Sequence, residues 1–439
     1  MRLLFDRGTI IIDGELSLPY IKWDKRINKF RTEAYYYKNI VEYLKNSNIL
    51  FLDDVFELIP CPHFSSTIKL RNYQKEALES WWASKKGTIV MPTGSGKTIL
   101  AIKIIEKLNT STLIVVPTLD LVNQWKKELN NAFNIEIGEF TGNKKLLKAI
   151  TVSTYESTYL NADNFGNKFK FIVFDEVHHL PSEGYRQIAE LFASPFRLGL
   201  TATYKREDNL HKELPRLIGN KVYDITPDIL SGTHLSTYEI KKIKVPLTDN
   251  EQREYKNAYD TFKSYLISNH IQMNNSNDFK KLIIRSGNNP KARIALLSRN
   301  KAEKIAFNSH NKLKELSKLL DKKNRTIIFT KYNSMVYKIS KRFLVPCITH
   351  QIKKDERNEI LNKFKKGEYS AIVSSRVLDE GINVPEANIG IIISGTGSSR
   401  EYTQRLGRLL RPGKNKKAIL YEIITKNTME VRIANKRRK

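Results

Sequence analysis

Cysteine is scarce in this sequence, which has only Cys61 and Cys347 among 439 residues, far apart along the chain. A disulfide framework, a structural zinc site or an iron–sulfur cluster would need more cysteine or histidine ligands at closer spacing. The composition therefore excludes all three. Any metal ion is expected to arrive with a substrate.

Long hydrophobic runs are missing as well. No stretch approaches the roughly 18 uncharged apolar residues that cross a bilayer. The N-terminal stretch Met1 to Phe5 is followed at once by Asp6, which is too short for a secretory signal. We therefore expect a soluble, cytoplasmic protein with no membrane partner.

Acidic residues are outnumbered, with 46 Asp and Glu against 75 Lys and Arg, for a formal net charge of +29. Such a surplus attracts polyanions. A merely lysine-rich proteome is the alternative explanation, and charge alone leaves DNA, RNA and membrane surfaces open. The 40% of hydrophobic residues is ample for folded cores, so wholesale disorder is excluded.

Short β-rich runs alternate with helical stretches over two long parts of the chain. Runs that are apolar throughout and separated by helices indicate parallel strands covered on both faces, so we predict two α/β lobes. A small α+β module precedes them, and a basic segment with aromatic residues at helical spacing interrupts the second lobe. The expected boundaries are residues 1–64 for the module, 65–227 for lobe 1, 228–430 for lobe 2, about 249–299 for its helical insertion and 431–439 for a basic tail.

A glycine-rich loop stands between the apolar run Thr88 to Val90 and a helical stretch that begins at Ile99. In such a loop backbone N–H groups turn toward phosphate oxygens and the helix N-terminus favours negative charge. This pattern predicts a P-loop that binds a nucleoside triphosphate, although Met91 stands where the first glycine of the strict motif would be. Lys97 would reach the β- and γ-phosphates and Thr98 would offer its hydroxyl to Mg²⁺. The predicted ATP-binding loop comprises Pro92, Thr93, Gly94, Ser95, Gly96, Lys97 and Thr98.

Two adjacent carboxylates end a second apolar run, in Phe171 to His179. Nucleotide hydrolysis needs one carboxylate for Mg²⁺ and another to orient and deprotonate the attacking water. We assign Asp175 to the metal ion and Glu176 to the water. His178 would either couple the nucleotide site to the next motif or lobe, or serve as a hydrogen-bonded structural histidine.

Arginines three positions apart follow a β-rich run near the C-terminus, in Gln404 to Arg411. Residues with this spacing share one face of a helix, so Arg408 and Arg411 can point together at a γ-phosphate bound by the other lobe. Gln404 belongs to the same predicted catalytic motif. ATP hydrolysis would then require the two lobes to close.

The ordered series of motifs resembles superfamily 2 helicases. It comprises Leu70 to Gln74, the P-loop, Val116 to Thr118 with Gln124-Trp125, Thr141-Gly142, Asp175 to His178, Thr201 to Thr203, Thr326 to Lys331, Ser374 to Pro385 and Gln404 to Arg411. The resemblance implies two RecA-like lobes. It also implies that Arg71 and Gln74 contact adenine, and that Thr118, Gly142, Thr201 and Thr203 serve DNA tracking or coupling. Gly381 and Asn383 would bind ATP, but Asn383 stands where many members carry Asp.

Within the superfamily the chain resembles XPB-type DNA repair helicases, in particular a compact archaeal form. The features are a DEVH box, Arg206-Glu207-Asp208 shortly after the Thr-Ala-Thr motif, a basic helical insertion and an N-terminal module. The resemblance implies 3'-5' DNA translocation in nucleotide excision repair. It further implies DNA opening by Arg206, Glu207 and Asp208, a thumb that grips DNA, a damage-recognition module, a prokaryotic setting and a nuclease partner. An RNA helicase, a restriction-type DNA translocase subunit and a non-enzymatic DNA-binding subunit are the alternatives.

Overall fold

The computed structural model describes residues 1–15, 17–206, 208–230, 237–273, 276–375, 387–395 and 417–436, together with Ser398, Tyr402 and Gly407. The chain divides into two compact units, Met1–Thr226 and Pro227–Lys439. Within the described residues, no helix is long and apolar enough to cross a membrane.

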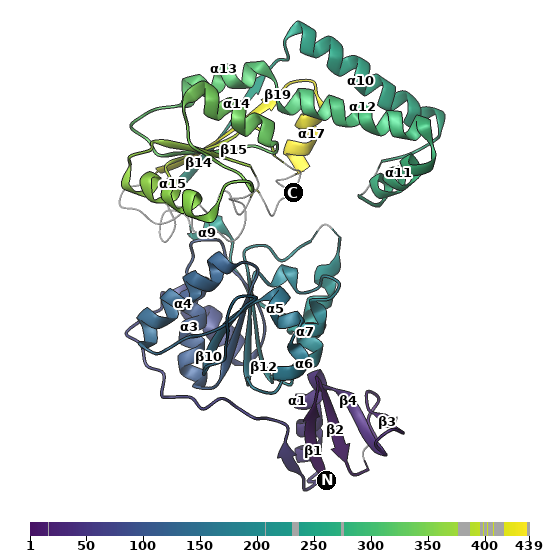
Figure 1. The fold of residues 1–439 in the computed structure, drawn as a ribbon, viewed down its shortest axis with the longest axis vertical. Helices are drawn as coiled ribbons and strands as arrows, with labels where there is room; N and C mark the ends of the chain where they lie inside the picture. Colours follow the sequence, from purple (N-terminus) through teal and green to yellow (C-terminus); the bar gives the residue numbers. More distant parts are fainter. Residues whose placement is uncertain are drawn as a thin grey trace. The chain divides into compact units, whose positions relative to one another are not determined.

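The N-terminal module is a five-stranded sheet with one helix against it (Figure 1). The strands lie in the order β3-β4-β2-β1-β5, antiparallel except for the parallel pair of β1 and β5. Alternate residues of β2 and one face of the helix point into a common core, which contains Ile10, Ile12, Ile40 and Leu44. The elements are β1 (Arg2–Asp6), β2 (Thr9–Asp13), β3 (Lys22–Asp24), β4 (Lys29–Glu33), a 3₁₀ turn (Ala34–Tyr36), α1 (Tyr37–Asn46) and β5 (Leu52–Asp54).

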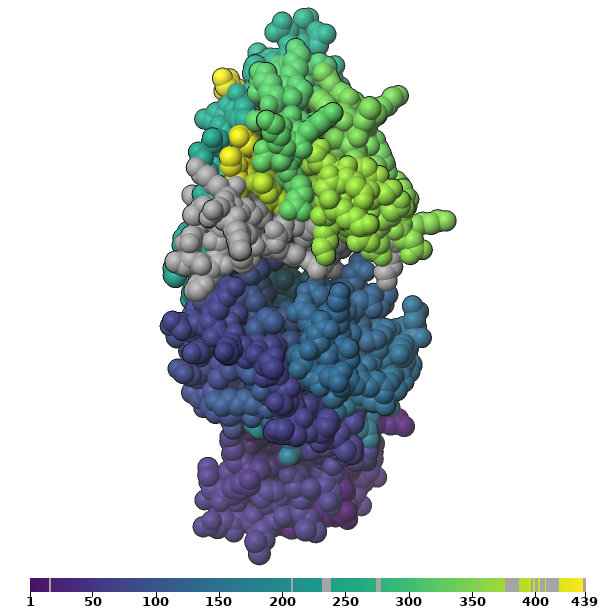
Figure 2. Space-filling model, turned by 90° about the vertical axis from the view of Figure 1, so that its left-hand side faces the viewer, coloured from purple at the N-terminus to yellow at the C-terminus, as the bar shows by residue number. Residues whose placement is uncertain are grey.

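A tyrosine clamp joins this module to the rest of the first unit. The ring of Tyr35 has the Arg197 guanidinium 4.8 Å from its centre and the Lys86 ammonium 4.7 Å from it, and its hydroxyl donates to the carbonyl of Arg216. Arg197 is buried and donates to the carbonyls of Ala189, Phe192, Ser194 and Leu217. The Tyr35 ring and hydroxyl therefore join the module to lobe 1, and the two parts are in contact on the face that Figure 2 shows.

The clamp gives a pH-dependent prediction. Burial, with the positive charges of Arg197 and Lys38 nearby, lowers the pKa of Lys86 to about 8. Between this value and about 10.4, the pKa of a lysine in an unfolded chain, the unfolded state binds more protons, so this lysine makes stability rise with pH. We expect Lys86→Met to raise the melting temperature at pH 7 by a margin that shrinks between pH 8 and 10, measured by circular dichroism.

The matched control is Lys45→Met, at an exposed lysine of α1. Its melting temperature is expected to keep a constant offset from that of the unsubstituted protein over the same range. An offset for Lys86→Met that does not change with pH would contradict the assigned effect of burial.

An extended segment between β5 and the first helix of lobe 1 lies along the lobe surface. Its residues bond to lobe 1 at several points: Asn167 donates to the carbonyl of Val55 (3.1 Å), the Phe64 amide donates to Asn109 Oδ1 (2.7 Å), and Ser66 Oγ donates to Glu106 (2.6 Å). Val55 and Phe64 are buried. The connection is thus a fixed strap rather than a free linker.

Lobe 1 is an eight-stranded sheet in the order β13-β6-β12-β11-β7-β10-β8-β9, parallel except for β9. Its central strands are apolar on both faces because helices cover both sides. The strands are β6 (Lys86–Val90), β7 (Thr112–Val116), β8 (Gly138–Phe140), β9 (Lys145–Leu146), β10 (Ile150–Thr154), β11 (Phe171–Asp175), β12 (Phe196–Thr201) and β13 (Lys221–Asp224). The helices are α2 (Asn72–Trp82), α3 (Lys97–Leu108), α4 (Leu119–Phe133), α5 (Tyr155–Tyr159), α6 (Ala162–Phe165), α7 (Arg186–Leu191) and α8 (Leu214–Leu217), and 3₁₀ turns cover Val177–His179 and Leu210–Glu213.

The second unit contains a six-stranded parallel sheet in the order β14-β19-β18-β15-β17-β16. Its core packs Leu316 of α13 and Ile339 of α14 against the central strands. The elements are α9 (Pro227–Leu230), β14 (Thr237–Val245), α13 (His310–Leu319), β15 (Thr326–Phe329), α14 (Asn333–Phe343), β16 (Cys347–Ile348), α15 (Lys354–Lys366), β17 (Ala371–Ser374), β18 (Ile389–Ile392), β19 (Lys417–Thr425) and α17 (Met429–Lys436).

The helical insertion is longer than predicted. It consists of α10 (Asp249–Ser268), α11 (Ser276–Asn288) and α12 (Pro290–Phe307), with α10 and α12 side by side (Figure 1). The predicted end near residue 299 is wrong because α12 continues to Phe307, whose ring packs in one cluster with Tyr255.

The segment predicted as a basic tail, residues 431–439, overlaps a helix. Residues 429–436 form α17 because Glu430 is buried in an ion pair with Lys312 of α13, 2.6 Å between Nζ and Oε1, and Ala434 is buried beside it.

Candidate functional site

Three loops meet at one edge of the lobe 1 sheet. The glycine-rich loop follows β6, the Thr-Ala-Thr segment follows β12 and the two adjacent carboxylates follow β11, and these three strands are neighbours in the sheet. Ligands of open parallel sheets bind outside the carboxyl ends of the strands. The sheet order therefore brings together three motifs that the sequence spreads over more than a hundred residues.

The glycine-rich loop has the backbone of a P-loop. Gly94 (φ 84°) and Gly96 (φ 80°) both adopt left-handed conformations, and Gly96 caps the N-terminus of α3. A Cβ on Gly96 would lie 2.5 Å from Gln74 Nε2, so a side chain there would strain the backbone and displace Gln74. Lys97 Nζ donates to the carbonyls of Met91 (3.1 Å) and Pro92 (3.4 Å), which holds the ammonium within the loop.

Helix α2, which precedes the loop in the sequence, holds the loop backbone by hydrogen bonds. Tyr73 donates its hydroxyl hydrogen to the Ser95 carbonyl (2.8 Å), and Gln74 Nε2 donates to the same carbonyl (3.0 Å). The Gln74 Oε1 accepts from the Arg71 amide (2.9 Å), which caps α2. Gln74 is buried, so its contacts in the structure are to the loop backbone, and its contact with adenine, like that of Arg71, stays a prediction.

Asp175 is buried at the end of β11, and both of its oxygens are held. Oδ1 accepts from the Glu176 amide (3.0 Å), and Oδ2 accepts from the indole N–H of Trp125 on α4 (2.8 Å). The pKa of Asp175 lies above its usual value. Burial raises it, and this effect outweighs the Trp125 hydrogen bond and the charge of Lys97, which both lower it. The sequence placed Trp125 in the motif series but gave it no role, because a bond between residues 50 positions apart has no local signal.

Glu176, His178 and Thr201 form one hydrogen-bonded group. His178 Nδ1 lies 3.1 Å from Thr201 Oγ1 and 3.4 Å from Glu176 Oε2, while Thr201 Oγ1 also contacts Glu176 Oε2 (3.5 Å) and the Thr203 carbonyl (2.9 Å). Glu176 has φ 48°, a left-handed conformation that is uncommon for this residue type and concentrates at functional sites. The structure thus brings the predicted water-activating carboxylate next to His178 and Thr201, and Thr203 joins the group through its hydrogen bonds with Thr201.

Arg206 contacts the same loop. Its guanidinium forms a two-point ion pair with Asp208 (2.7 and 2.9 Å) and donates to the carbonyl of His178. The arginine predicted to take part in DNA opening is therefore one hydrogen bond away from the DEVH segment. No sequence pattern predicted this link.

Two residues predicted to track DNA lie elsewhere on lobe 1. Thr118 caps the N-terminus of α4, where its hydroxyl accepts from the Leu121 amide (3.4 Å). Gly142 is exposed and has no atom within 4 Å of the place where a Cβ would lie, so its surroundings are open. The other predicted site residues lie outside the described residues: Glu207, Gly381, Asn383, Gln404, Arg408 and Arg411.

The donor set suits a metal ion that arrives with phosphates. Among the residues that the structure describes, no group of three or more His, Cys, Asp and Glu side chains could hold an ion by itself. Mg²⁺ in nucleotide sites needs one or two protein ligands besides phosphate oxygens and water. A buried carboxylate with fixed oxygens, Asp175, fits this requirement, with Thr98 in the first turn of α3 as the second predicted ligand.

Three family models match the chain. "Type III restriction enzyme, res subunit" matches residues 67–206, "Helicase conserved C-terminal domain" matches 311–413, and "Xeroderma pigmentosum group B helicase damage recognition domain" matches 3–55. The DNA 3'-5' translocase XPB2 of Sulfurisphaera tokodaii is 42% identical over 438 residues, which cover 99% of each chain. The chain belongs to the XPB family of superfamily 2 helicases.

Other XPB relatives are longer. The DNA 3'-5' helicase XPB of Mycobacterium tuberculosis is 30% identical over 84% of this chain but only 63% of its own length. The transcription and repair factor IIH subunit XPB of Dictyostelium discoideum is 28% identical, over 46% of its length. The chain thus spans about half to two thirds of these two relatives, and nearly all of XPB2.

A solved structure supports the fold. The helicase domain of Pyrococcus furiosus Hef superimposes with a TM-score of 0.55 over 84% of this XPB-family chain and 98% of its own, at 19% identity. This match and the two parallel sheets confirm the predicted α/β fold class with two RecA-like lobes.

Proposed function

We propose that this chain is an ATP-dependent DNA translocase that opens or tracks along duplex DNA during repair, with 3'-5' polarity. The observation that carries the proposal is the meeting of a P-loop lysine, a buried carboxylate and a second carboxylate at the ends of neighbouring strands. These are the protein groups that phosphoryl transfer to water requires on one lobe. The 42% identity to a named DNA translocase over nearly the whole chain supports DNA as the substrate.

Each group has a role that its surroundings support. Lys97 exchanges its loop carbonyls for the β- and γ-phosphates of ATP, and Asp175 with Thr98 would hold Mg²⁺. The metal ion, when bound, neutralises charge on the phosphates. Glu176 orients the attacking water and accepts its proton. Arg408 and Arg411, with Gln404 from the same motif, are proposed from the sequence to offset the charge that develops on the γ-phosphoryl group.

The contacts around Glu176 offer a route from hydrolysis to DNA. Its carboxylate lies within reach of His178 and Thr201, and the carbonyl of His178 accepts a hydrogen bond from Arg206. A change at the γ-phosphate that moves Glu176 would also shift His178, and through the His178 carbonyl it would change the position of Arg206. We propose that Arg206 to Asp208 act on the duplex in response.

Trp125 is proposed as a positioning residue for Asp175. Phe at this position keeps the buried ring but removes the N–H that holds Oδ2. We expect Trp125→Phe to raise the Mg²⁺ concentration for half-maximal binding of a fluorescent ATP analogue by about 10-fold, the lower end for lost partners of metal ligands. Trp82→Phe, at a partly exposed tryptophan of α2, is the control, and equal Mg²⁺ requirements in both variants would contradict the role.

The decisive experiment compares ATP hydrolysis with double-stranded DNA, single-stranded DNA and RNA. Binding mainly to phosphates predicts stimulation that is insensitive to sequence and falls steeply with salt. We expect DNA to stimulate most; stronger stimulation by RNA would favour an RNA helicase. Repeating the assay with and without a candidate nuclease tests the proposed partner.

A further inference from the structure

His211 lies in the short turn that follows the segment proposed to act on the duplex. It belongs to the 3₁₀ turn Leu210–Glu213, shortly after Asp208. Its ring folds back on that segment, where Nδ1 accepts a hydrogen bond from the backbone amide of Arg206, with 3.1 Å between the two nitrogens. The imidazole thus joins the two ends of the loop from Arg206 to His211.

Other hydrogen bonds give this loop a fixed shape. The Asn209 amide donates to the Arg206 carbonyl (3.3 Å). The Leu210 amide donates to Asp208 Oδ1 (3.1 Å), and the Asp208 carboxylate also holds the Arg206 guanidinium in the two-point ion pair. With the contact from His211, both the backbone and the side chain of Arg206 are held within the loop.

Only a neutral His211 can make its contact with Arg206. A backbone amide can only donate, so Nδ1 must offer a lone pair and the ring proton must lie on Nε2. An imidazolium carries hydrogen on both nitrogens and would face the amide with a second donor. Protonation of His211 would therefore release the Arg206 backbone at this end of the loop.

The surroundings keep the ring neutral. The pKa of His211 lies below its usual value of 6.5, because partial burial and the positive charge of Lys212 outweigh the attraction of Asp208. The Tyr204 ring stands edge-on to His211, with centroids 5.9 Å apart. The charged groups around the two rings are Lys205, Arg206 and Asp208 before the turn, Lys212 and Glu213 on it, Arg216 of α8, which pairs with Glu213 and Glu190, and Lys221 of β13.

We propose that His211 is a positioning residue for DNA opening, because it fixes the backbone of Arg206 and so the direction of the Arg206 guanidinium. The inference rests on the proposed function, in which Arg206 to Asp208 act on the duplex. The contact is complete above the pKa of His211 and is lost as the pH falls through it. Opening should then fail at acidic pH in steps where ATP is still hydrolysed.

The test measures base pairs opened per ATP hydrolysed, with a fluorophore–quencher duplex and a phosphate sensor in the same sample, from about pH 7.5 down to about pH 5.5, the range in which histidines titrate. We expect this ratio to fall toward acidic pH in the unsubstituted protein. His211→Phe keeps a ring beside Tyr204 but has no acceptor. It should open about 5-fold fewer base pairs per ATP at neutral pH, the weight of one ordinary hydrogen bond.

His211→Asn separates the acceptor from the ring. Its Oδ1 stands two bonds from Cβ, as Nδ1 does in histidine, and can accept from the Arg206 amide, but the side chain does not gain a proton in this range. We expect this variant to keep most of the opening per ATP at neutral pH and to show no fall at acidic pH.

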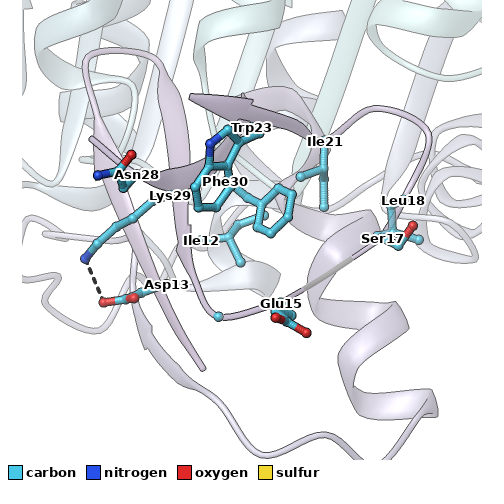
Figure 3. A pocket seen from close by; sticks show the side chains of 11 residues that line it. Ile12, Asp13, Glu15, Ser17, Leu18, Ile21, Trp23, Asn28, Lys29 and Phe30 are labelled. Atoms are coloured by element: carbon cyan, nitrogen blue, oxygen red, sulfur yellow. Dashed lines mark hydrogen bonds and ion pairs between the residues drawn. The ribbon is translucent and has the colours of Figure 1, made fainter. Parts of the chain in front are cut away.

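Two controls lie on the same compact unit. His63→Asn removes an exposed histidine of the strap and should leave the pH profile unchanged. Trp23→Phe changes a half-exposed aromatic residue in the pocket of the N-terminal module that Figure 3 shows, and should leave opening per ATP unchanged on undamaged duplex. Circular dichroism of each variant shows whether the fold is retained.

An unchanged ratio in a folded His211→Phe protein would overturn the inference, and so would an acidic fall that persists in His211→Asn. The second outcome decides the matter even where His211→Phe does not fold. ATP hydrolysis that DNA does not stimulate would contradict the proposed function. Stimulated hydrolysis with opening that is indifferent to the residue at position 211 contradicts this inference alone.

Discussion

Glu176→Gln is expected to lower the rate of ATP hydrolysis by about 10²- to 10⁴-fold, the usual contribution of a positioned acid–base group, while ATP binding persists. Gln has the same shape and can still contact His178 and Thr201, but it cannot accept a proton from water. The P-loop, including Lys97, is unchanged in this variant, so the nucleotide keeps its phosphate contacts.

The measurement combines steady-state hydrolysis with equilibrium binding of a fluorescent ATP analogue. Glu183→Gln, at an exposed carboxylate a few residues further along the chain, controls for loss of negative charge. Hydrolysis near the unsubstituted rate would remove Glu176 from the reaction, and loss of ATP binding would show that the carboxylate supports the site instead.

Lys97→Ala should reduce hydrolysis about 10²- to 10³-fold, the range for removal of one group that stabilises transition-state charge. It should leave DNA affinity within about 2-fold in the absence of nucleotide, because Lys97 is one of 75 Lys and Arg residues and phosphate contacts are expected to be spread over many of them. The ammonium donates to the Met91 and Pro92 carbonyls, and the first helical turn of α3 positions it there.

ATPase assays and fluorescence anisotropy of labelled duplex DNA check both halves of this result. Lys107→Ala, at an exposed lysine near the C-terminal end of α3, is the matched control. A purified Lys97→Ala protein with normal turnover would contradict the P-loop assignment. Loss of DNA binding together with ATPase would indicate a damaged fold instead.

Much of the fold could be predicted because apolar runs and helical spacing are local signals. The apolar run Thr112–Val116 forms β7, and Tyr37–Asn46, with Ile40 and Leu44 at helical spacing, forms α1. The predicted insertion ended near residue 299, but α12 continues to Phe307. The packing of Phe307 with Tyr255 joins these residues to the insertion, and this contact has no local signal in the sequence.

The site was predictable to the extent that motifs follow strands. The ends of neighbouring parallel strands share one edge, and the structure shows that the P-loop, Glu176 and Thr201 meet for this reason. The bonds from Trp125 to Asp175 and from Arg206 to His178 join distant residues and depend on tertiary packing. Arg197 is a similar case: arginine is rarely fully buried, and hydrogen bonds to four carbonyls, three between Ala189 and Ser194 and one at Leu217, make its burial tolerable.

The Tyr35 clamp and the strap from Val55 to Ser66 have a consequence for how the N-terminal module can move. Both attachments join its sheet to lobe 1, so the module and the P-loop belong to one compact unit. Any rotation of lobe 1 during an ATP cycle would therefore carry the module along, at an unchanged distance from Lys97.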